Sequence, residues 1–231
     1  MPNSGPRDDL RDRFLALSDD LISKCGTRSL SFNIHDTEAA QAPSPMPAPQ
    51  GESRHIGQVS VWLDCYQSRL DFESGMSGLG FPYSGYLVVE SLYDTYGTTP
   101  YAESRYWPDG TRSPGVLTVA IVHRPEGLEY NEWIRRWHEV QSPVSGQLQP
   151  RTRYVRNEIV RPMTQSAPEI NGIVEEGWPS AMHVSDPMLF FKAESKEELD
   201  ANISRMMESV NSCLDLSRLR STTMSEYLLQ S

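Results

Sequence analysis

The first half of the chain combines one clear helical stripe with short segments of strand character. Residues 8–24 carry apolar side chains at helical spacing from Leu10 to Leu21, and Gly26 follows as a stop signal. Turn-forming residues flank the other predicted segments of the first half. They predict strands at 28–34, 55–64 and 84–93, with a short helix around 65–76 between the last two. The predicted order is therefore helix, strand, strand, helix, strand.

The second half has a more regular pattern. Residues 115–124 form a near-continuous apolar run, which is typical of a strand covered on both faces. Residues 129–141 carry an aromatic and aliphatic stripe that predicts an amphipathic helix. Ser195 and Glu198 form a capping box ahead of a second amphipathic helix that extends to about residue 210. Further strands are predicted at 151–160, 171–178 and 219–229.

The order of these elements predicts the fold class. In the second half the order β-α-β-β-α-β matches the ferredoxin-like split βαβ motif. The first half follows the same plan without its opening strand and with a Pro-rich loop, expected to be mobile or extended, at 40–54. We therefore predict an α+β protein in which tandem ferredoxin-like repeats, at 1–110 and 111–231, form a (pseudo-)dimeric α/β barrel. A monomer follows if the two repeats close on each other, and a homodimer if only the second repeat pairs.

Composition narrows the classes of partner. The formal net charge is −10 with a pI near 5.0, which argues against nucleic-acid binding because that binding needs clustered basic residues. We find no pattern typical of a secretion signal and no apolar run of about 20 residues that could span a membrane. Three widely spaced cysteines suit a reducing compartment, so we expect a cytoplasmic protein.

Four arginines gather in one segment: Arg151, Arg153, Arg156 and Arg161. Glu158 and Glu169 offset their charge, so we interpret the segment as a solvated strand edge rather than an anion site. The pairs His35 with Asp36 and His183 with Asp186 lack the fixed spacing of metal motifs. Residues 75–85 contain glycines but lack the lysine of a phosphate loop. We therefore expect neither a metal nor a nucleotide cofactor.

The helix at 129–141 holds the first candidate site residues. At about 100° per residue, Trp133, Trp137 and Gln141 lie in its apolar stripe and His138 lies on the flank. Pro143 disfavours helical geometry in the residue before it, which places Gln141 in the last turn. The Gln141 amide can either cap free carbonyls there or contact a ligand. His138 is either a half-exposed residue near the helix end or an acid–base group.

Two strands supply the remaining candidates. Alternation in 153–160 places Tyr154 and Asn157 on opposite faces, and we favour Asn157 as the cavity residue because it shares the apolar side. Glu175 and Glu176 also take opposite faces. The inward one either acts as a buried acid or pairs with an arginine, and we favour the pairing.

Several of these motifs resemble a known family. The segments "EWIRRWHEVQSPV", "YVRNEIVRPMTQSAP" and "GIVEEGWP" together resemble the EthD-domain family, within the dimeric α/β-barrel proteins. The first-half segments "SVWLD", "GYLVVES" and "DGTRSPGV" resemble a longer subgroup with a divergent repeat before the EthD domain. The family pattern has a tryptophan followed by a histidine before a small residue and a proline. Trp137 and Pro143 match this pattern, whereas Gln141 occupies the histidine position.

The resemblance implies a mostly apolar cavity that needs no metal or organic cofactor. The expected function is binding of a small apolar, oxygenated organic molecule, with proton transfer, rearrangement or degradation as the reaction. His138 would then be the catalytic acid–base group, because glutamine cannot exchange a proton near neutral pH. The ligand contacts would come from Gln141, Asn157, Tyr154, Trp133, Trp137 and Glu175. The alternative is a non-catalytic binding or accessory protein that supports an oxidoreductase pathway.

Overall fold

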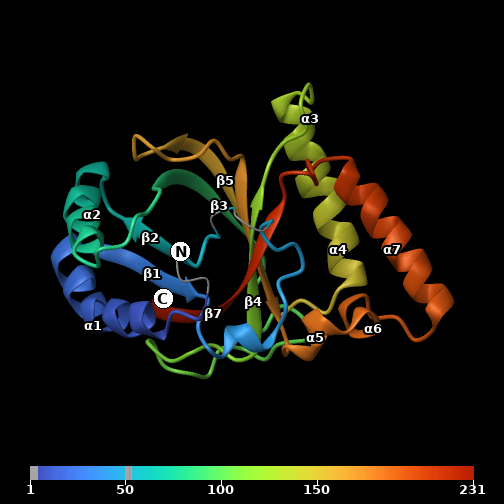
Figure 1. The fold of residues 1–231 in the computed structure, drawn as a ribbon, viewed down its shortest axis with the longest axis horizontal. Helices are drawn as coiled ribbons and strands as arrows, with labels where there is room; N and C mark the ends of the chain where they lie inside the picture. Colours follow the sequence, from blue (N-terminus) through green and yellow to red (C-terminus); the bar gives the residue numbers. More distant parts are fainter. Residues whose placement is uncertain (1–4, 50–51, 53) are drawn as a thin grey trace.

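The computed structural model describes residues 5–49, 52 and 54–231. Its seven strands form one antiparallel sheet in the order β2-β1-β7-β4-β6-β5-β3 (Figure 1). The strands are β1 (Thr27–Ile34), β2 (Gly57–Leu63), β3 (Tyr86–Asp94), β4 (Val116–Val122), β5 (Arg153–Pro162), β6 (Gly172–Trp178) and β7 (Arg220–Gln230). Both predicted halves thus contribute strands to the same sheet, and the mixed α+β class is confirmed.

Helices cover two regions of this sheet. The α-helices are α1 (Asp8–Cys25), α2 (Arg69–Ser77), α3 (Tyr130–Arg135), α4 (Ser142–Leu148), α5 (Met182–Ser185), α6 (Pro187–Phe190) and α7 (Lys196–Asn211). Two 3₁₀ turns, η1 (Ala39–Gln41) and η2 (Tyr66–Ser68), and one π-helix, η3 (Arg136–Gln141), complete the set. Figure 1 shows α1 and α2 at one end of the molecule and α3, α4 and α7 at the other.

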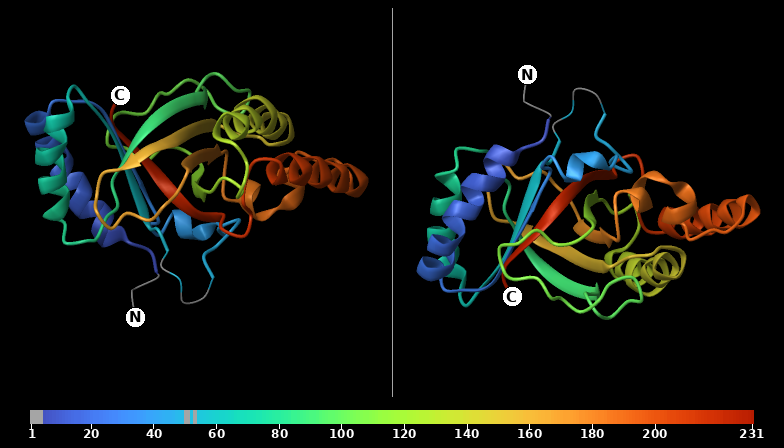
Figure 2. Two further views of the ribbon diagram at one scale, coloured as in Figure 1. Left: turned by 90° about the horizontal axis from the view of Figure 1, so that it is seen from above. Right: turned by 90° about the horizontal axis from the view of Figure 1, so that it is seen from below.

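The sheet curls strongly. The Gln58 side chain of β2 donates a hydrogen bond of 2.7 Å to Glu175 of β6, although four strand spacings separate these strands in the sheet order. In a flat sheet four spacings would amount to about 19 Å. The two ends of the sheet are therefore brought toward each other, as the end-on views of Figure 2 show.

The curled sheet remains open between β2 and β3. These two strands are its edges within the described residues. Six successive antiparallel pairings connect β2 to β3, so the two edges run parallel to each other. They cannot continue the antiparallel ladder by pairing directly. We refer to the space between them as the β2–β3 gap.

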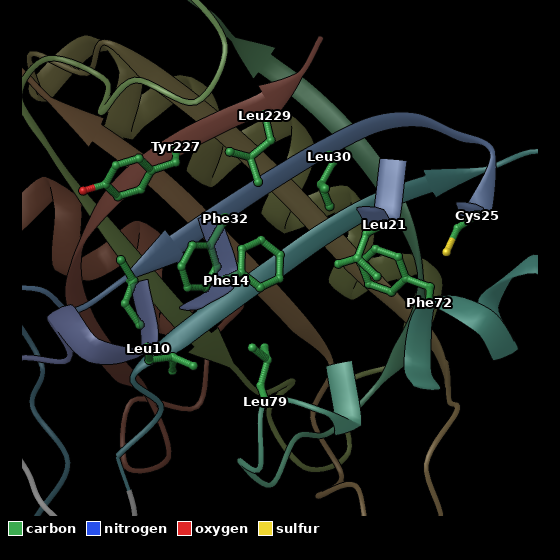
Figure 3. Packing of buried hydrophobic residues seen from close by; sticks show 11 residues of the cluster. Leu10, Phe14, Leu21, Cys25, Leu30, Phe32, Phe72, Leu79, Tyr227 and Leu229 are labelled. Carbon is green, nitrogen blue, oxygen red and sulfur yellow. The ribbon is translucent and has the colours of Figure 1, made fainter. Parts of the chain in front are cut away.

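One hydrophobic core joins α1 and α2 to β1, β2 and β7. Leu10, Phe14 and Leu21 of α1 pack against Leu30 and Phe32 of β1 (Figure 3). The Phe14 and Phe32 rings are stacked with centroids 4.2 Å apart. The helical stripe predicted from Leu10 to Leu21 is thus confirmed as the buried face of α1.

Each strand has an inner face, directed into the curl, and an outer face, directed toward the helices. Leu117, Ile173 and Met224 pack together on the inner face. Val122 and Val174 point the other way and pack in the core beneath α3 and η3. Residues that are neighbours in one strand therefore lie in chemically separate environments.

The helix predicted to end at Gln141 instead continues to Leu148, so that prediction is wrong. The backbone N–H of Ser142 bonds to the Trp137 carbonyl, five residues back, and the Ser142 hydroxyl bonds to the same oxygen at 2.9 Å. The wider π turn allows the chain to pass Pro143, which lacks an N–H and occupies the beginning of α4.

The solvated strand edge predicted for the arginine segment is also wrong. Arg151, Arg153 and Arg156 are buried, and of the four only Arg161 is exposed. For Arg153 and Arg156 the reason is that β5 is an internal strand, paired with β6 on one side and with β3 on the other, whereas Arg151 precedes β5 and is covered by α4. Strand β3 belongs to the first half of the chain. The charge balance within the arginine segment therefore gave no information about its pairing with β5.

The beginning of the Pro-rich loop is fixed against β7. The Ala42 carbonyl accepts a hydrogen bond from the Thr223 hydroxyl, and the Met46 carbonyl accepts one from the Ser221 backbone. Residues 50, 51 and 53 of this loop lie outside the described residues. Over residues 42–46 the loop therefore covers a neighbouring strand instead of extending freely.

The capping box that starts α7 is confirmed. The Ser195 hydroxyl accepts a hydrogen bond from the Glu198 backbone at 3.1 Å, and the Glu198 carboxylate accepts one from the Glu194 backbone at 2.8 Å. Two short helices before it, α5 and α6, had no clear pattern in the sequence. Among the residues with described positions, no helix has the length and apolar character needed to cross a membrane.

Candidate functional site

The segment η3 lies against the outer face of the sheet and carries three of the predicted site residues. Single π turns inside α-helices often mark functional sites because they redirect side chains. Here the π turn includes Trp137, His138 and Gln141. Trp133 of α3 and Tyr154 of β5 face the same region, and the two remaining candidates, Asn157 and Glu175, lie on the opposite face of the sheet.

The two tryptophans fill the space beneath the helix. Trp133 and Trp137 are each 1 % exposed, and their rings lie 5.1 Å apart. Gly172 of β6 permits this packing, because a Cβ atom there would lie 2.7 Å from the Trp137 ring. Both side chains therefore act first as core residues that fix η3 on the sheet.

Gln141 contacts Tyr154. The Tyr154 hydroxyl donates a hydrogen bond of 3.3 Å to the Gln141 side-chain oxygen, and both residues are buried. The helix continues past Gln141, so this amide caps no helix end. Its inward direction, predicted from the helical stripe, is confirmed.

His138 lies at the edge of this cluster. Its ring packs edge-on against Trp137 at 5.2 Å, and among the described residues its buried Nε2 atom has no hydrogen-bond partner. Burial, together with the nearby Arg156 charge, lowers the pKa of His138 to about 4. The imidazole is therefore neutral at neutral pH and cannot donate a proton as an imidazolium there.

Arg156 is a buried guanidinium held by hydroxyl groups. It donates hydrogen bonds of 2.9 Å to Ser142 and to Ser91, and it forms no ion pair with any carboxylate of the described residues. Burial lowers the pKa of its guanidinium. Its Nε atom has no hydrogen-bond partner within the described part of the chain. The sheet thus holds a positive charge here without a direct counter-ion.

Arg151 lies beside it and is also buried. Its guanidinium stacks 3.9 Å from the Tyr154 ring centroid and donates hydrogen bonds of 2.9 Å to the Ser145 hydroxyl and 3.2 Å to the Asp94 carboxylate. Gly146 of α4 permits this approach, because a Cβ atom there would lie 3.0 Å from the guanidinium. Helix α4 therefore packs directly over the arginine.

A pocket of about 250 Å³ opens next to Arg151 on the outer face. Its walls come from the end of β3, the 98–101 segment and α4, and include Tyr93, Asp94, Tyr101, Pro143, Gly146 and Arg151. The volume lies just below the roughly 300–1,000 Å³ of sites for drug-sized ligands, so the pocket suits a small molecule. Aromatic and proline side chains form its apolar wall.

Two of the residues that line this pocket are charged, Arg151 and Asp94, and Arg156 lies behind the lining next to Tyr93. Arg151 and Arg156 carry two guanidinium groups. Asp94 lies 3.2 Å from Arg151, and Glu176 lies 3.9 Å from it. Burial raises the pKa of Glu176, which favours its neutral form more than for an ordinary glutamate. Two guanidinium groups and two carboxylates therefore lie at this site, and Glu176 is the carboxylate whose charge burial opposes.

Asn157 and Glu175 form a separate cluster on the inner face. The Asn157 amide donates a hydrogen bond of 3.0 Å to Glu175, and Arg153 pairs with Glu175 at 2.6 Å. The favoured interpretation that the inward glutamate pairs with an arginine is thus confirmed. The sheet separates this pair from Tyr154 and Gln141, so one ligand cannot contact all the predicted residues.

Sequence reasoning missed four outer-face residues: Tyr93, Asp94, Arg151 and Arg156. One signal was available, because the arginines flank Tyr154, a residue already taken as a candidate. The contribution of β3 could not be anticipated, since it depends on pairing between residues about 60 positions apart. Within the described residues, no group of three or more His, Cys, Asp or Glu side chains could hold a metal ion.

Comparisons with known proteins add little at the level of sequence. No family model and no curated protein matches the chain, so the EthD resemblance rests on the quoted motifs alone. One solved structure, described as a crystal structure study of an anthrone oxidase-like protein, is similar, with a TM-score of 0.47 and 12 % sequence identity. The alignment covers 98 % of this chain and 90 % of that chain.

Proposed function

We propose that this protein binds a small oxygenated organic molecule in the outer-face pocket between α4 and the end of β3. The pocket beside the buried Arg151 and Arg156 pair carries this proposal. A ligand of this class would place its ring or carbon skeleton against Tyr93, Tyr101 and Pro143. Its phenol, enol or carboxyl oxygen would be directed toward Arg151. The motifs that resemble EthD-domain proteins support the same class of ligand.

A catalytic role is the second candidate function, and His138 favours it. The imidazole is neutral at neutral pH, and its Nε2 atom has no partner in the described residues, so it can accept a proton. The nearby Arg156 charge would stabilise an enolate or phenolate formed in such a step. Binding without chemistry predicts that His138 is dispensable, whereas proton transfer predicts that its replacement by alanine abolishes turnover of a bound substrate.

We also propose that the two halves of the chain are divergent ferredoxin-like repeats. The order β7-β4-β6-β5 in the second half and the crossover from β2 through α2 to β3 in the first half support this relationship. In this arrangement the β2–β3 gap is the position of the strand that the first half lacks. A monomeric pseudo-dimer follows, and the intact mass of the native protein tests it.

The first experiment on the pocket uses a matched pair of probes, benzoate and benzamide. We expect benzoate to bind more tightly, by about tenfold, because Arg151 and Arg156 favour an anionic oxygen group. Ligand-observed NMR titrations measure both affinities. Equal affinities would contradict the assigned preference for acidic oxygen.

The variant Tyr101→Ala removes one pocket wall and is expected to weaken benzoate binding about three- to tenfold. Tyr106→Ala is the control, because Tyr106 belongs to the same connecting segment but does not line the pocket. Loss of binding in both variants, or in neither, would place the ligand elsewhere. Native mass spectrometry of freshly purified protein then shows whether an endogenous molecule of this class is retained.

A further inference from the structure

Lys192 has a left-handed backbone conformation. Its φ is 51°, and within the described residues no other non-glycine residue has a positive φ. The residue follows α6, and its N–H bonds to the Leu189 carbonyl at 3.3 Å. The N–H of Ala193 bonds to the Met188 carbonyl at 2.9 Å. These two bonds form a Schellman motif, in which glycine usually occupies the left-handed position, so a lysine here is more strained than a glycine.

Helix α7 fixes the turn that carries Lys192. Asn202 of α7 donates a hydrogen bond of 3.0 Å to the carbonyl of Phe191, the residue before Lys192. Arg205, also on α7, donates one to the side-chain oxygen of Gln147 on α4. Figure 1 shows α7 beside α4, in agreement with these contacts. The position of Lys192 relative to α4 is therefore set by the packing of two helices and not by the lysine side chain alone.

The Lys192 ammonium lies at the rim of the outer-face pocket. It donates a hydrogen bond of 2.7 Å to the Gln147 carbonyl and lies 5.3 Å from the centroid of the Tyr101 ring. Both residues line the pocket, one from α4 and the other from the 98–101 segment, so the ammonium bridges two walls. An ammonium has three N–H donors, and the Gln147 carbonyl occupies one of them. A ligand in the pocket can accept hydrogen bonds from the others.

The pocket therefore has two cations, one in its wall and one at its rim. Arg151 lines the wall and pairs with Asp94 at 3.2 Å, whereas Lys192 has no ion-pair partner within the described part of the chain. The Arg151 guanidinium would be 3.0 Å from a Cβ atom at Gly146 of α4, and the Lys192 ammonium is bonded to the residue after it. Bond lengths then limit the distance between the two cations to roughly 12 Å. An aromatic ring with an acidic group at each end is long enough to contact both.

We propose that the ligand of the outer-face pocket carries two acidic groups at opposite ends of its carbon skeleton, and that Lys192 binds the second one. This inference rests on the proposed function, which directs the first acidic oxygen toward Arg151. The skeleton packs against Tyr93 and Tyr101, and the second acidic group accepts a charge-assisted hydrogen bond from the Lys192 ammonium. The strained backbone then has a functional reason, because a glycine at this position would relieve the strain and lose the ammonium.

Terephthalate and its monomethyl ester test the second acidic group, because they share one skeleton and differ by one carboxylate. We expect terephthalate to bind at least about tenfold more tightly than the ester in ligand-observed NMR titrations. Benzoate, titrated in parallel, tests the proposed function separately. If benzoate binds while terephthalate and its ester bind equally, the second acidic group is overturned and the pocket assignment stands. If none of the three binds, the pocket assignment and this inference both fail.

Lys192→Gly separates ligand binding from a structural role of the lysine. The variant removes the ammonium and relieves the left-handed backbone, so the preference for terephthalate over the ester should fall below about threefold while Tm stays the same or rises. Lys192→Met keeps the backbone strain and should lose the same preference. Benzoate affinity should change less than about twofold in both variants. A full preference in both would refute the proposal, and a lowered Tm of Lys192→Gly with the preference kept would show that Lys192 only caps α4.

Lys196→Met is the matched control for charge. It removes the same charge from an exposed position at the beginning of α7, four residues further along the chain. Solvent screens such a charge, so the preference for terephthalate should change less than about twofold. Lys192→Arg keeps a cation at the rim and should retain most of the preference. Equal losses in Lys196→Met and Lys192→Met would indicate a long-range charge effect and would overturn the direct contact assigned to Lys192.

Discussion

The two faces of β5 differ in both packing and charge. On the outer face, Tyr154 and Arg156 lie beneath η3, next to two tryptophans that fill the core. On the inner face, Arg153 and Asn157 lie within a buried network of carboxylates. Consecutive residues of a single strand thus belong to two chemically distinct regions.

This comparison shows that burial alone does not define the role of an arginine. Arg153 and Arg156 are both buried, at 8 % and 6 % exposure. Arg153 compensates two buried carboxylates, whereas Arg156 is held by the hydroxyls of Ser91 and Ser142. The first is a component of a balanced network, and the second is a charge available to a neighbour.

The largest contrast is expected between Arg153→Met and Arg156→Met. Loss of Arg153 leaves Glu175 and Glu226 without their counter-ion, which should reduce the free energy of unfolding by about 3–5 kcal/mol. Loss of Arg156 removes one hydrogen bond each from the Ser91 and Ser142 hydroxyls, and Ser142 keeps its bond to the Trp137 carbonyl, so the cost should be about 1 kcal/mol. Urea denaturation of both variants measures the difference. Equal losses would show that the two arginines have equivalent environments.

A second contrast concerns the tryptophans of the two regions. Trp137→Ala removes a fully buried ring and should reduce the free energy of unfolding by about 3–5 kcal/mol. Trp62→Ala removes a ring that is 53 % exposed at the gap, and its cost should stay below about 1 kcal/mol. Thermal and urea unfolding check both values. A large cost for Trp62→Ala would indicate that the gap is closed by packing.

The smallest effect concerns the pH dependence of stability through His138. Its pKa is about 4 in the folded protein, below the unfolded value of about 6.5, so the unfolded state takes up the proton first. Stability should therefore fall as the pH decreases from about 6.5 to about 4 and then level off. The full shift corresponds to roughly 3.4 kcal/mol, and because His138 is only half-buried, solvent screening reduces the expected contribution to about 2 kcal/mol. In His138→Gln this contribution disappears, and denaturation curves at pH 7 and pH 4 measure it.

Arg156→Met provides a control for that dependence. Without the nearby positive charge the pKa of His138 should rise, which reduces the loss of stability at low pH, although burial still holds the pKa down. His35, His55 and His123 also have pKa values lowered by burial, so a part of the pH dependence will persist in both variants. An unchanged slope in His138→Gln would place the imidazole in a more solvated environment.

Much of the local structure could be predicted from the sequence. The apolar stripe of α1, the continuous run of β4 and the capping box of α7 each follow from short-range periodicity or hydrogen bonding. The alternation in β5 also assigned Tyr154 and Asn157 to opposite faces correctly. Local rules succeed where the physical cause lies within a few residues.

Such local rules predicted the candidate sites less well. Pro143 suggested a helix end, yet the π turn that precedes it allows the helix to continue. The outer-face pocket needs Tyr93 and Asp94 from the first half of the chain beside Arg151 from the second. Residues so distant in sequence come into contact only because β3 pairs with β5. The periodicity within either segment does not predict that pairing.

The sequence by itself determined the strands, most of the helices, the two faces of β5 and the acidic character of the chain. The tertiary structure decided which face is filled, which is open and which charges are paired. The physical reason is that alternation and helical spacing are local properties of the backbone. Burial of Arg153 and Arg156 instead depends on the strands that pair with β5, burial of Arg151 depends on the packing of α4, and the β2–β3 gap depends on how far the whole sheet curls.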